Sequence, residues 1–327
     1  MTLIIALATL SSFALTPIAS RLARAVGAVD HPGERRVHTF ATPRFGGPAI
    51  FGAILIASMA STQWRGFRAL FLGAFIAMMV GALDDIHPQK PLTKLLVEVI
   101  AAVIVISGGW SGAGLGSFLM SVAFIVVTTN AINLVDGLDG LAAGLALMIA
   151  LTLVLLSHGG SHAVMLLAVC GALLGFLPYN VHPARIFLGD SGALLVGFLL
   201  GTGAISDMHS VGAIAPAIAL GFPLLEVMMT IARRFVRASP LFRADRDHIH
   251  HRVLGLGLDP RATVGLLYGC GAAFCAVALI LPRLDDILKV PLLASLSLGI
   301  VGGVRMLGYH REMTALAPPL RINASEP

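Results

Sequence analysis

Charged side chains are scarce in this chain of 327 residues. Asp, Glu, Lys and Arg together make up 12% of it, well below the roughly 25% typical of soluble domains. The hydrophobic fraction is 57% and the mean hydropathy is +0.90. These values exclude a soluble globular protein and predict an integral membrane protein with no room for a large soluble domain.

Cysteine is equally rare. The three cysteines, Cys170, Cys270 and Cys275, all lie in apolar stretches and form no CxxC pattern, which excludes a disulfide framework. The first apolar stretch, residues 1–16, resembles a signal peptide, but no basic segment precedes it. We therefore expect it to be retained as the first transmembrane helix.

Apolar runs close to bilayer-spanning length recur along the chain. They predict about 11 transmembrane helices in one all-α bundle, forming a single domain over residues 1–327. The expected spans are Leu3–Ala19, Gly47–Thr62, Phe67–Leu83, Leu95–Ser107, Leu115–Thr129, Leu141–Ser157, Ala163–Leu177, Gly192–Ile205, Ile214–Ile231, Ala262–Leu281 and Val290–Val304.

The basic residues divide unequally between the two sides of this arrangement. Of the 22 Lys and Arg residues, four (Arg65, Arg68, Arg283 and Lys289) fall on one side and the other 18 on the opposite side. The positive-inside rule makes the richer side cytoplasmic, with the N-terminus outside and the C-terminus cytoplasmic. Although the pI is about 9.6, this scatter over many loops favours anionic lipid or nucleotide partners and no nucleic acid.

The cytoplasmic loops also carry most of the polar motifs. We expect the active site to form from loops 21–46, 84–94, 130–140, 178–191 and 232–261. A membrane transporter, the alternative of another class, would place ionisable groups near the membrane midplane. Only Glu98 and Glu226 lie inside apolar spans. Glu98 can pair with Lys94 at i, i+4, and Glu226 is near the end of its span.

The densest polar stretch is Asn130–Gly144, between two apolar runs. Asn133, Asp136 and Asp139 lie there beside turn-forming glycines that let a ligand approach the backbone. Carboxylates at the edge of a membrane indicate a functional site. The alternative is a loop in which Asp139 only caps the next helix.

Three further carboxylates complete a predicted cation site. Asp84 and Asp85 end the third apolar run, and Asp190 stands where the eighth begins. Together with Asp136 and Asp139 they suit Mg²⁺, which takes oxygen ligands from carboxylates and substrate phosphates. The alternatives are a solvated helix end for the pair and a helix cap for Asp190. Asn180, which precedes Asp190 in the same loop as His182 and Arg185, adds a ligand-like group.

Two basic segments indicate anion binding. His248, His250 and His251 lie between arginines, including Arg252. Without a cysteine or a well-spaced fourth ligand, this arrangement suits an anion better than zinc, and a merely solvated loop is the other alternative. Arg44, followed by Gly46-Gly47 at a predicted helix start, can grip a phosphate near backbone N–H groups. A basic loop that only sets topology would explain it as well.

Four motifs in this order resemble the polyprenyl-phosphate N-acetylhexosamine-1-phosphate transferases, from about Asp30 to Arg252 and through the last two spans. The motifs are the 30–47 loop, the Asp84-Asp85 pair, the Asn130–Gly144 stretch and the histidine cluster His248, His250 and His251. One departure is Pro88, which replaces a third aspartate that the family often carries.

The resemblance implies a Mg²⁺- or Mn²⁺-dependent transfer of sugar 1-phosphate from a UDP-N-acetylhexosamine to polyprenyl phosphate. The enzyme would be a multi-pass protein of the bacterial plasma membrane with its active site in the cytoplasm. The resemblance leaves open whether it forms a homodimer. Asp190 would bind the metal with Asp136 and Asp139, and Asp84 or Asp85 would orient or deprotonate the lipid phosphate. Substrate contacts would come from Arg44, Asn133, Asn180, His248, His250, His251 and Arg252.

The form of the histidine motif, His-Ile-His-His, resembles the branch that uses UDP-N-acetylglucosamine. The alternative within the family is the phospho-N-acetylmuramoyl-pentapeptide transferase of peptidoglycan synthesis, which carries a different His-rich motif. The sequence names neither the prenyl length nor the polymer made downstream.

Overall fold

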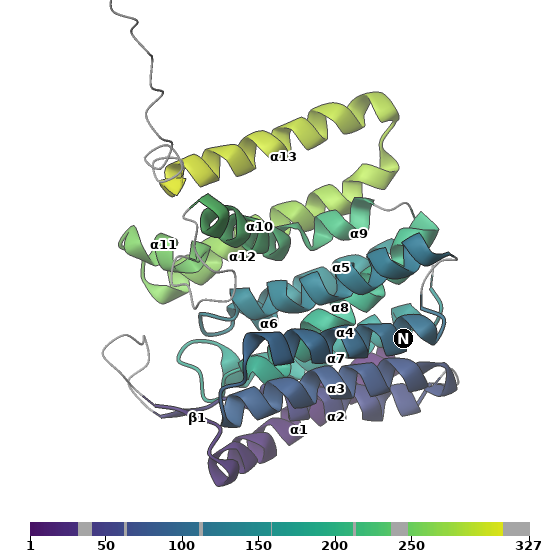
Figure 1. The fold of residues 1–327 in the computed structure, drawn as a ribbon, viewed down its shortest axis with the longest axis vertical. Coiled ribbons are helices and arrows are strands. Elements are labelled where there is room, and N and C mark those ends of the chain that lie inside the picture. Colours follow the sequence, from purple (N-terminus) through teal and green to yellow (C-terminus); the bar gives the residue numbers. More distant parts are fainter. Residues whose placement is uncertain are drawn as a thin grey trace, which may run out of the picture.

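A computed structural model describes residues 1–31, 41–61, 64–110, 114–157, 159–211, 214–236 and 248–309. Most of the helices run side by side along one common direction (Figure 1). They are α1 (Thr2–Val26), α2 (Gly46–Met59), α3 (Arg68–Ile86), α4 (Pro91–Ser107), α5 (Leu115–Val135), α6 (Leu141–Leu156), α7 (Ser161–Asn180), α8 (Gly189–Val211), α9 (Ile214–Ala219), α10 (Gly221–Val236), α11 (Ile249–Gly255), α12 (Pro260–Ile280) and α13 (Asp286–Met306). Two 3-10 turns, Trp64–Phe67 and Leu281–Arg283, complete the helical part.

The apolar runs predicted from the sequence coincide with helices, and the all-α class is confirmed. By length and composition, seven helices among the described residues can cross a membrane, and α2 and α6 are shorter apolar helices. One predicted span, Ile214–Ile231, is instead divided into α9 and α10. Pro223 explains the break, because it has no N–H to donate to the carbonyl of Ala219.

The helices extend beyond the apolar runs, so several predicted loop residues lie on helix ends. Arg21 and Arg24 belong to α1, which ends at Gly27 in the left-handed conformation (φ 82°). Asn130 and Asn133 belong to α5. The predicted loop positions 32–40 and 237–247 lie outside the described residues.

The core of the bundle is built around α8. Between Gly189 and Ser206 of this helix 89% of the residues are buried, whereas none are buried in α13 at the edge of the bundle (Figure 1). Gly81 of α3 shows how closely the neighbours approach, because a Cβ there would overlap the backbone of Asp190. The N-terminus of α8 is thereby fixed against α3.

One end of the bundle gathers the segments that carry the polar motifs. The turns joining α5 to α6 and α7 to α8 lie there with α11 and the strand β1 (Figure 1). The strands β1 (Val29–Asp30) and β2 (Thr42–Pro43) form an antiparallel pair, with Val29 opposite Pro43. The N–H of Phe187 donates to the carbonyl of Pro43 (2.8 Å). This ribbon, which the sequence did not predict, fixes Arg44 beside the start of α8.

Candidate active site

The two carboxylates of the predicted Asp84-Asp85 pair have different hydrogen-bond partners. Asp85 accepts hydrogen bonds from the N–H groups of Asp190 (2.9 Å) and Ser191 (3.0 Å), and its side chain is 0% exposed. These donors have no partner within helix α8, and a carboxylate also suits the positive end of the helix dipole. Asp84 instead accepts from the N–H of Gln89 (2.7 Å). Asp85 therefore holds α3 and α8 together.

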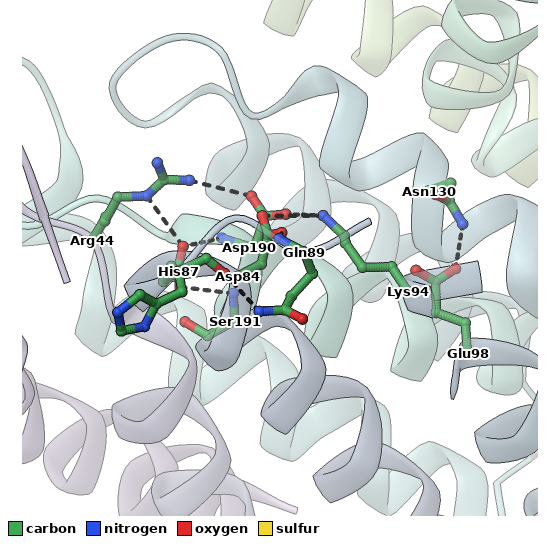
Figure 2. Close-up of polar contacts among 10 residues, drawn as sticks. Arg44, Asp84, His87, Gln89, Lys94, Glu98, Asn130, Asp190 and Ser191 are labelled. Carbon is green, nitrogen blue, oxygen red and sulfur yellow. Dashed lines mark hydrogen bonds and ion pairs between the residues drawn. The ribbon is translucent and has the colours of Figure 1, made fainter. Parts of the chain in front are cut away.

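Two basic side chains cross this junction (Figure 2). Arg44 Nε lies 3.1 Å from Asp85 Oδ1, and its Nη2 lies 3.3 Å from Asp190 Oδ1. Lys94 Nζ lies 3.3 Å from Asp84 Oδ2 and pairs with Asp190 Oδ2. Burial alone would lower the pKa of Arg44, but the carboxylates of Asp85 and Asp190 outweigh this and raise it. Arg44 and Lys94 thus flank Asp190 from both sides.

Lys94 was missed as a site residue because its spacing from Glu98 offered a local explanation. The predicted partner at i, i+4 was Glu98, but the Lys94 amine reaches Asp84 and Asp190, and Glu98 accepts from Asn130 (Figure 2). The signal that would have found it is its position at the start of a helix, ten residues after Asp84, at the same end of the bundle as the acids.

Asp136 adds another carboxylate to this group. It follows the last residue of α5, and in the described part of the chain its side chain has no hydrogen-bond partner. Burial raises the pKa of Asp136 to about 8, and the negative charge of Asp190 adds to the shift. We call Asp84, Asp85, Asp136 and Asp190 the acid cluster. Among the residues that the structure describes, the cations facing this cluster are Arg44 and Lys94.

This charge balance fits a divalent cation, although no carboxylate cage is preformed. Among the residues that the structure describes, no group of three or more His, Cys, Asp or Glu side chains is arranged to hold a metal. Within the described ranges, four carboxylates and two basic groups leave two uncompensated negative charges when all of them are ionised. Mg²⁺ needs only one or two protein carboxylates when substrate phosphates supply the rest.

Asp139 and Asn180, predicted to bind metal and substrate respectively, both hold the segment between α7 and α8. Asp139 Oδ2 lies 2.8 Å from His182 Nδ1 and accepts from the N–H of Ala184 (3.0 Å). Asn180 is buried and donates to the carbonyl of Ile186 (3.0 Å). The half-buried Asn133 lies on the last turns of α5, before Asp136.

Gly46 and Gly47, which were predicted to lie beside a bound anion, allow α2 to pack closely against α8. The N–H of Gly46 donates to the carbonyl of Leu188 (3.0 Å). A Cβ on Gly47 would overlap the backbone of Ser191. The absence of side chains here lets α2 approach the start of α8. Anion binding by this segment stays a prediction, and Arg44 is the side chain that would supply it.

The histidine cluster stands at the start of α11 and is anchored by Glu226 of α10. Glu226 Oε1 lies 2.8 Å from His248 Nδ1, and both carboxylate oxygens accept from the N–H of Ile249 (3.2 and 3.1 Å). The imidazoles of His248 and His250 stack with centroids 5.6 Å apart. Burial lowers the pKa of His250 to about 3, and the charges of His251 and His248 add to the shift. His250 is therefore a neutral imidazole.

The histidine cluster meets the α5–α6 turn directly. A Cβ on Gly137 would overlap the ring of His250, so Asp136 is one residue away from this contact. Tyr268 of α12 donates to the carbonyl of Gly140 (2.6 Å) and fixes the other end of the turn. The acid cluster and the histidine cluster thus border one site.

Arg252 has a structural task in addition to its predicted contact with substrate. Its Nη1 donates to the carbonyl of Leu307 (3.0 Å), and its guanidinium lies over the ring of Tyr309 at 3.9 Å from the centroid. These contacts tie α11 to the segment after α13. Glu226, in contrast, was missed because its place near the end of an apolar run suggested no partner 22 residues downstream.

An apolar helical bundle with a charged site at one end defines a multi-pass membrane enzyme. The sequence pattern of the family described as Glycosyl transferase family 4 matches residues 67–207. A Bacillus subtilis protein named probable undecaprenyl-phosphate N-acetylglucosaminyl 1-phosphate transferase is 36% identical over 291 residues, covering 82% of this chain and 81% of its own length.

Further relatives agree with this match. A decaprenyl-phosphate N-acetylglucosaminephosphotransferase of Mycobacterium tuberculosis is 35% identical, covering 80% of this chain and 77% of its own length. An undecaprenyl-phosphate alpha-N-acetylglucosaminyl 1-phosphate transferase of Thermotoga maritima is 31% identical, covering 73% and 77%. The chain belongs to glycosyl transferase family 4.

Proposed function

We propose that this protein transfers N-acetylglucosamine 1-phosphate from UDP-N-acetylglucosamine to undecaprenyl phosphate or another polyprenyl phosphate, starting a lipid-linked cell-envelope glycan. The observation that carries the proposal is the similarity, along 82% and 80% of this chain, to relatives named for this transfer. The paired basic and acidic groups of the site suit phosphate chemistry, and the His-Ile-His-His motif supports the choice of sugar.

The reaction exchanges one phosphoanhydride for another. An oxygen of the lipid phosphate attacks the β-phosphorus of the UDP-sugar, and UMP leaves with the electron pair of the broken P–O bond. The exchange is close to thermoneutral. Such a transfer needs neutralised charge and in-line positioning more than covalent help from the protein.

We assign these tasks to the groups that border the site. Arg44 and Lys94 bind phosphate oxygens and keep them in line. Asp84 orients the lipid phosphate, because its side chain is 17% exposed, whereas the side chain of Asp85 is fully buried and held by the N–H groups of Asp190 and Ser191. Proton removal adds little, since a phosphate monoester (pKa₂ about 6) is already largely a dianion near neutral pH.

We extend the proposal to the donor side and to a cation. His248, held through Nδ1 by Glu226, directs its other nitrogen to the sugar nucleotide, and His250 and His251 complete that contact. Asp190 and Asp136 would hold Mg²⁺ or Mn²⁺, whose charge neutralises the diphosphate when it is bound. Asp139 keeps the neighbouring segment in place through His182 and Ala184.

The direct test is release of UMP by purified protein in detergent. We expect UMP and a sugar-diphosphate lipid, identified by mass, with UDP-N-acetylglucosamine and polyprenyl phosphate together, and no UMP without the lipid. UMP only with UDP-N-acetylmuramoyl-pentapeptide would assign the peptidoglycan branch instead. Gradient-driven movement of a solute into proteoliposomes, without UMP from any UDP-sugar, would overturn the enzyme proposal in favour of a transporter.

We also propose that the site faces the cytoplasm of a bacterial cell, with the N-terminus outside. The division of basic residues, 18 against four, supports this orientation. The two ends of α12 test it in a variant without the natural cysteines. An impermeant thiol reagent applied to intact cells should label Arg283→Cys, and Leu258→Cys only after the cells are opened. Labelling of Leu258→Cys alone in intact cells would reverse the topology.

A further inference from the structure

A separate cavity of about 430 Å³ lies between the end of α1 and the segment that joins α7 to α8. Its walls are the last turns of α1, the residues around β2 and the stretch from Tyr179 to Ile186. No side chain of the acid cluster or the histidine cluster lines it. Three arginines do, namely Arg21, Arg24 and Arg185, and we call it the arginine pocket.

The charge of the arginine pocket has no counterpart within the described chain. Arg21, Arg24 and Arg185 are exposed, no acidic residue lines the cavity, and their guanidinium groups form no ion pair or hydrogen bond in the described ranges. Arg44 and Lys94, by contrast, are each paired with two carboxylates. Guanidinium groups bind phosphate oxygens with paired, charge-assisted hydrogen bonds, so the pocket is suited to an anion.

The apolar surroundings indicate that this anion is carried by a lipid. Along α1, the side chains of Phe13, Ile18 and Leu22 are 50%, 56% and 46% exposed on the outer surface of the bundle. Tyr179 lines the pocket, and the centroid of its ring lies 5.1 Å from the ring centroid of Phe13. Acyl chains can therefore lie along α1 while the headgroup reaches the arginines. Basic pockets between membrane helices bind anionic headgroups in this way.

We propose that the arginine pocket binds the phosphate headgroup of an anionic membrane phospholipid, at a site distinct from the one that carries out the transfer. The bound headgroup would also stabilise the α7–α8 segment, which borders the candidate active site. The pocket wall includes Ala184, whose N–H donates to Asp139, and the nearby Phe187 N–H donates to Pro43, next to Arg44.

The test compares two double variants of the full chain in neutral detergent. Arg21→Gln/Arg24→Gln removes two charges from the pocket, and Lys90→Gln/Arg305→Gln removes two exposed charges elsewhere at the same end. Native mass spectrometry and the melting temperature report binding of phosphatidylglycerol. We expect one bound molecule and a raised melting temperature in the wild type and the control. The pocket variant should bind roughly 30-fold more weakly, about fivefold for each basic side chain near the headgroup.

Other probes distinguish the source of the phosphate. Phosphatidylcholine and inorganic phosphate at equal concentration should give no stabilisation, and polyprenyl phosphate should bind both double variants equally. Equal binding of phosphatidylglycerol by the two variants would overturn the proposal. So would stabilisation by inorganic phosphate alone, or loss of polyprenyl phosphate binding in the pocket variant. Because these readouts need no UDP-sugar, they are independent of the proposed transfer.

Discussion

Replacing Asp190 by Asn should reduce UMP release by a factor on the order of 10³ while the protein stays folded. The carboxylate of Asp190 contacts both Arg44 and Lys94. Asn keeps the size and one acceptor oxygen but removes the charge that orders these cations and would hold the metal. Loss of one preorganised electrostatic group in an active site costs roughly 10² to 10³ in turnover, and the metal contact adds to this.

The same assay tests the cation. Wild-type turnover should stop in EDTA and return with Mg²⁺ or Mn²⁺, and Asp190→Asn should need a higher Mg²⁺ concentration for its residual activity. Asp286→Asn is the matched control, because Asp286 is exposed at the start of α13 and pairs with Lys289. Normal turnover of the Asp190→Asn protein would show that Asp190 has only a structural role. Full activity in the presence of chelator would show that the reaction needs no divalent cation.

Glu226 and His248 should act as one unit. We expect His248→Ala to lower kcat by about 10² to 10³, as for loss of one charge-stabilising donor. Glu226→Gln should lower kcat by roughly 10 to 100-fold, by analogy with loss of a carboxylate that orients a metal-bound histidine. Glu226 is a positioning residue in this scheme, because it fixes the proton of the imidazole on Nδ1 and leaves Nε2 for substrate.

A double-mutant cycle separates this role from simple stabilisation. If Glu226 acts through His248, the double variant should be no slower than His248→Ala alone. Binding of polyprenyl phosphate should not change, and KM for the UDP-sugar should rise less than kcat falls. His162→Ala, at the opposite end of the bundle, serves as the control. Additive losses in the cycle would contradict the proposed unit, and so would a Glu226→Gln variant that loses only thermal stability.

The helices could be predicted from the sequence because each apolar run is a local property. The break near Pro223 had a local signal too, the proline itself, but the length of the apolar run favoured a single span over residues 214–231. Contacts between distant elements had no such signal. The bonds from Asp85 to α8 join residues 105 and 106 positions apart. Only packing could show that the side chain of Asp85 is fully buried whereas that of Asp84 stays partly exposed.

Site residues followed the same division. Of the polar groups predicted to gather at one end, the described residues Asp190, Arg44, Asp84 and Asp85 lie together there. Local pairing rules failed for Lys94 and Glu226, whose partners come from other helices. Asp139, Asn180 and Arg252 show the converse, because each carries the polar chemistry of a ligand contact but also holds a neighbouring segment in place.

The buried carboxylate of Asp85 also constrains how the protein is made. Its backbone partners, Asp190 and Ser191, are synthesised about a hundred residues later, after four more helices have emerged between α3 and α8. Until α8 arrives, α3 carries an unsatisfied charge that is costly to bury, so this end must stay close to water. Docking of α8 then completes its burial, which makes the arrival of α8 the step in biogenesis at which the acid cluster is assembled, before α10 and α11 bring the histidine cluster.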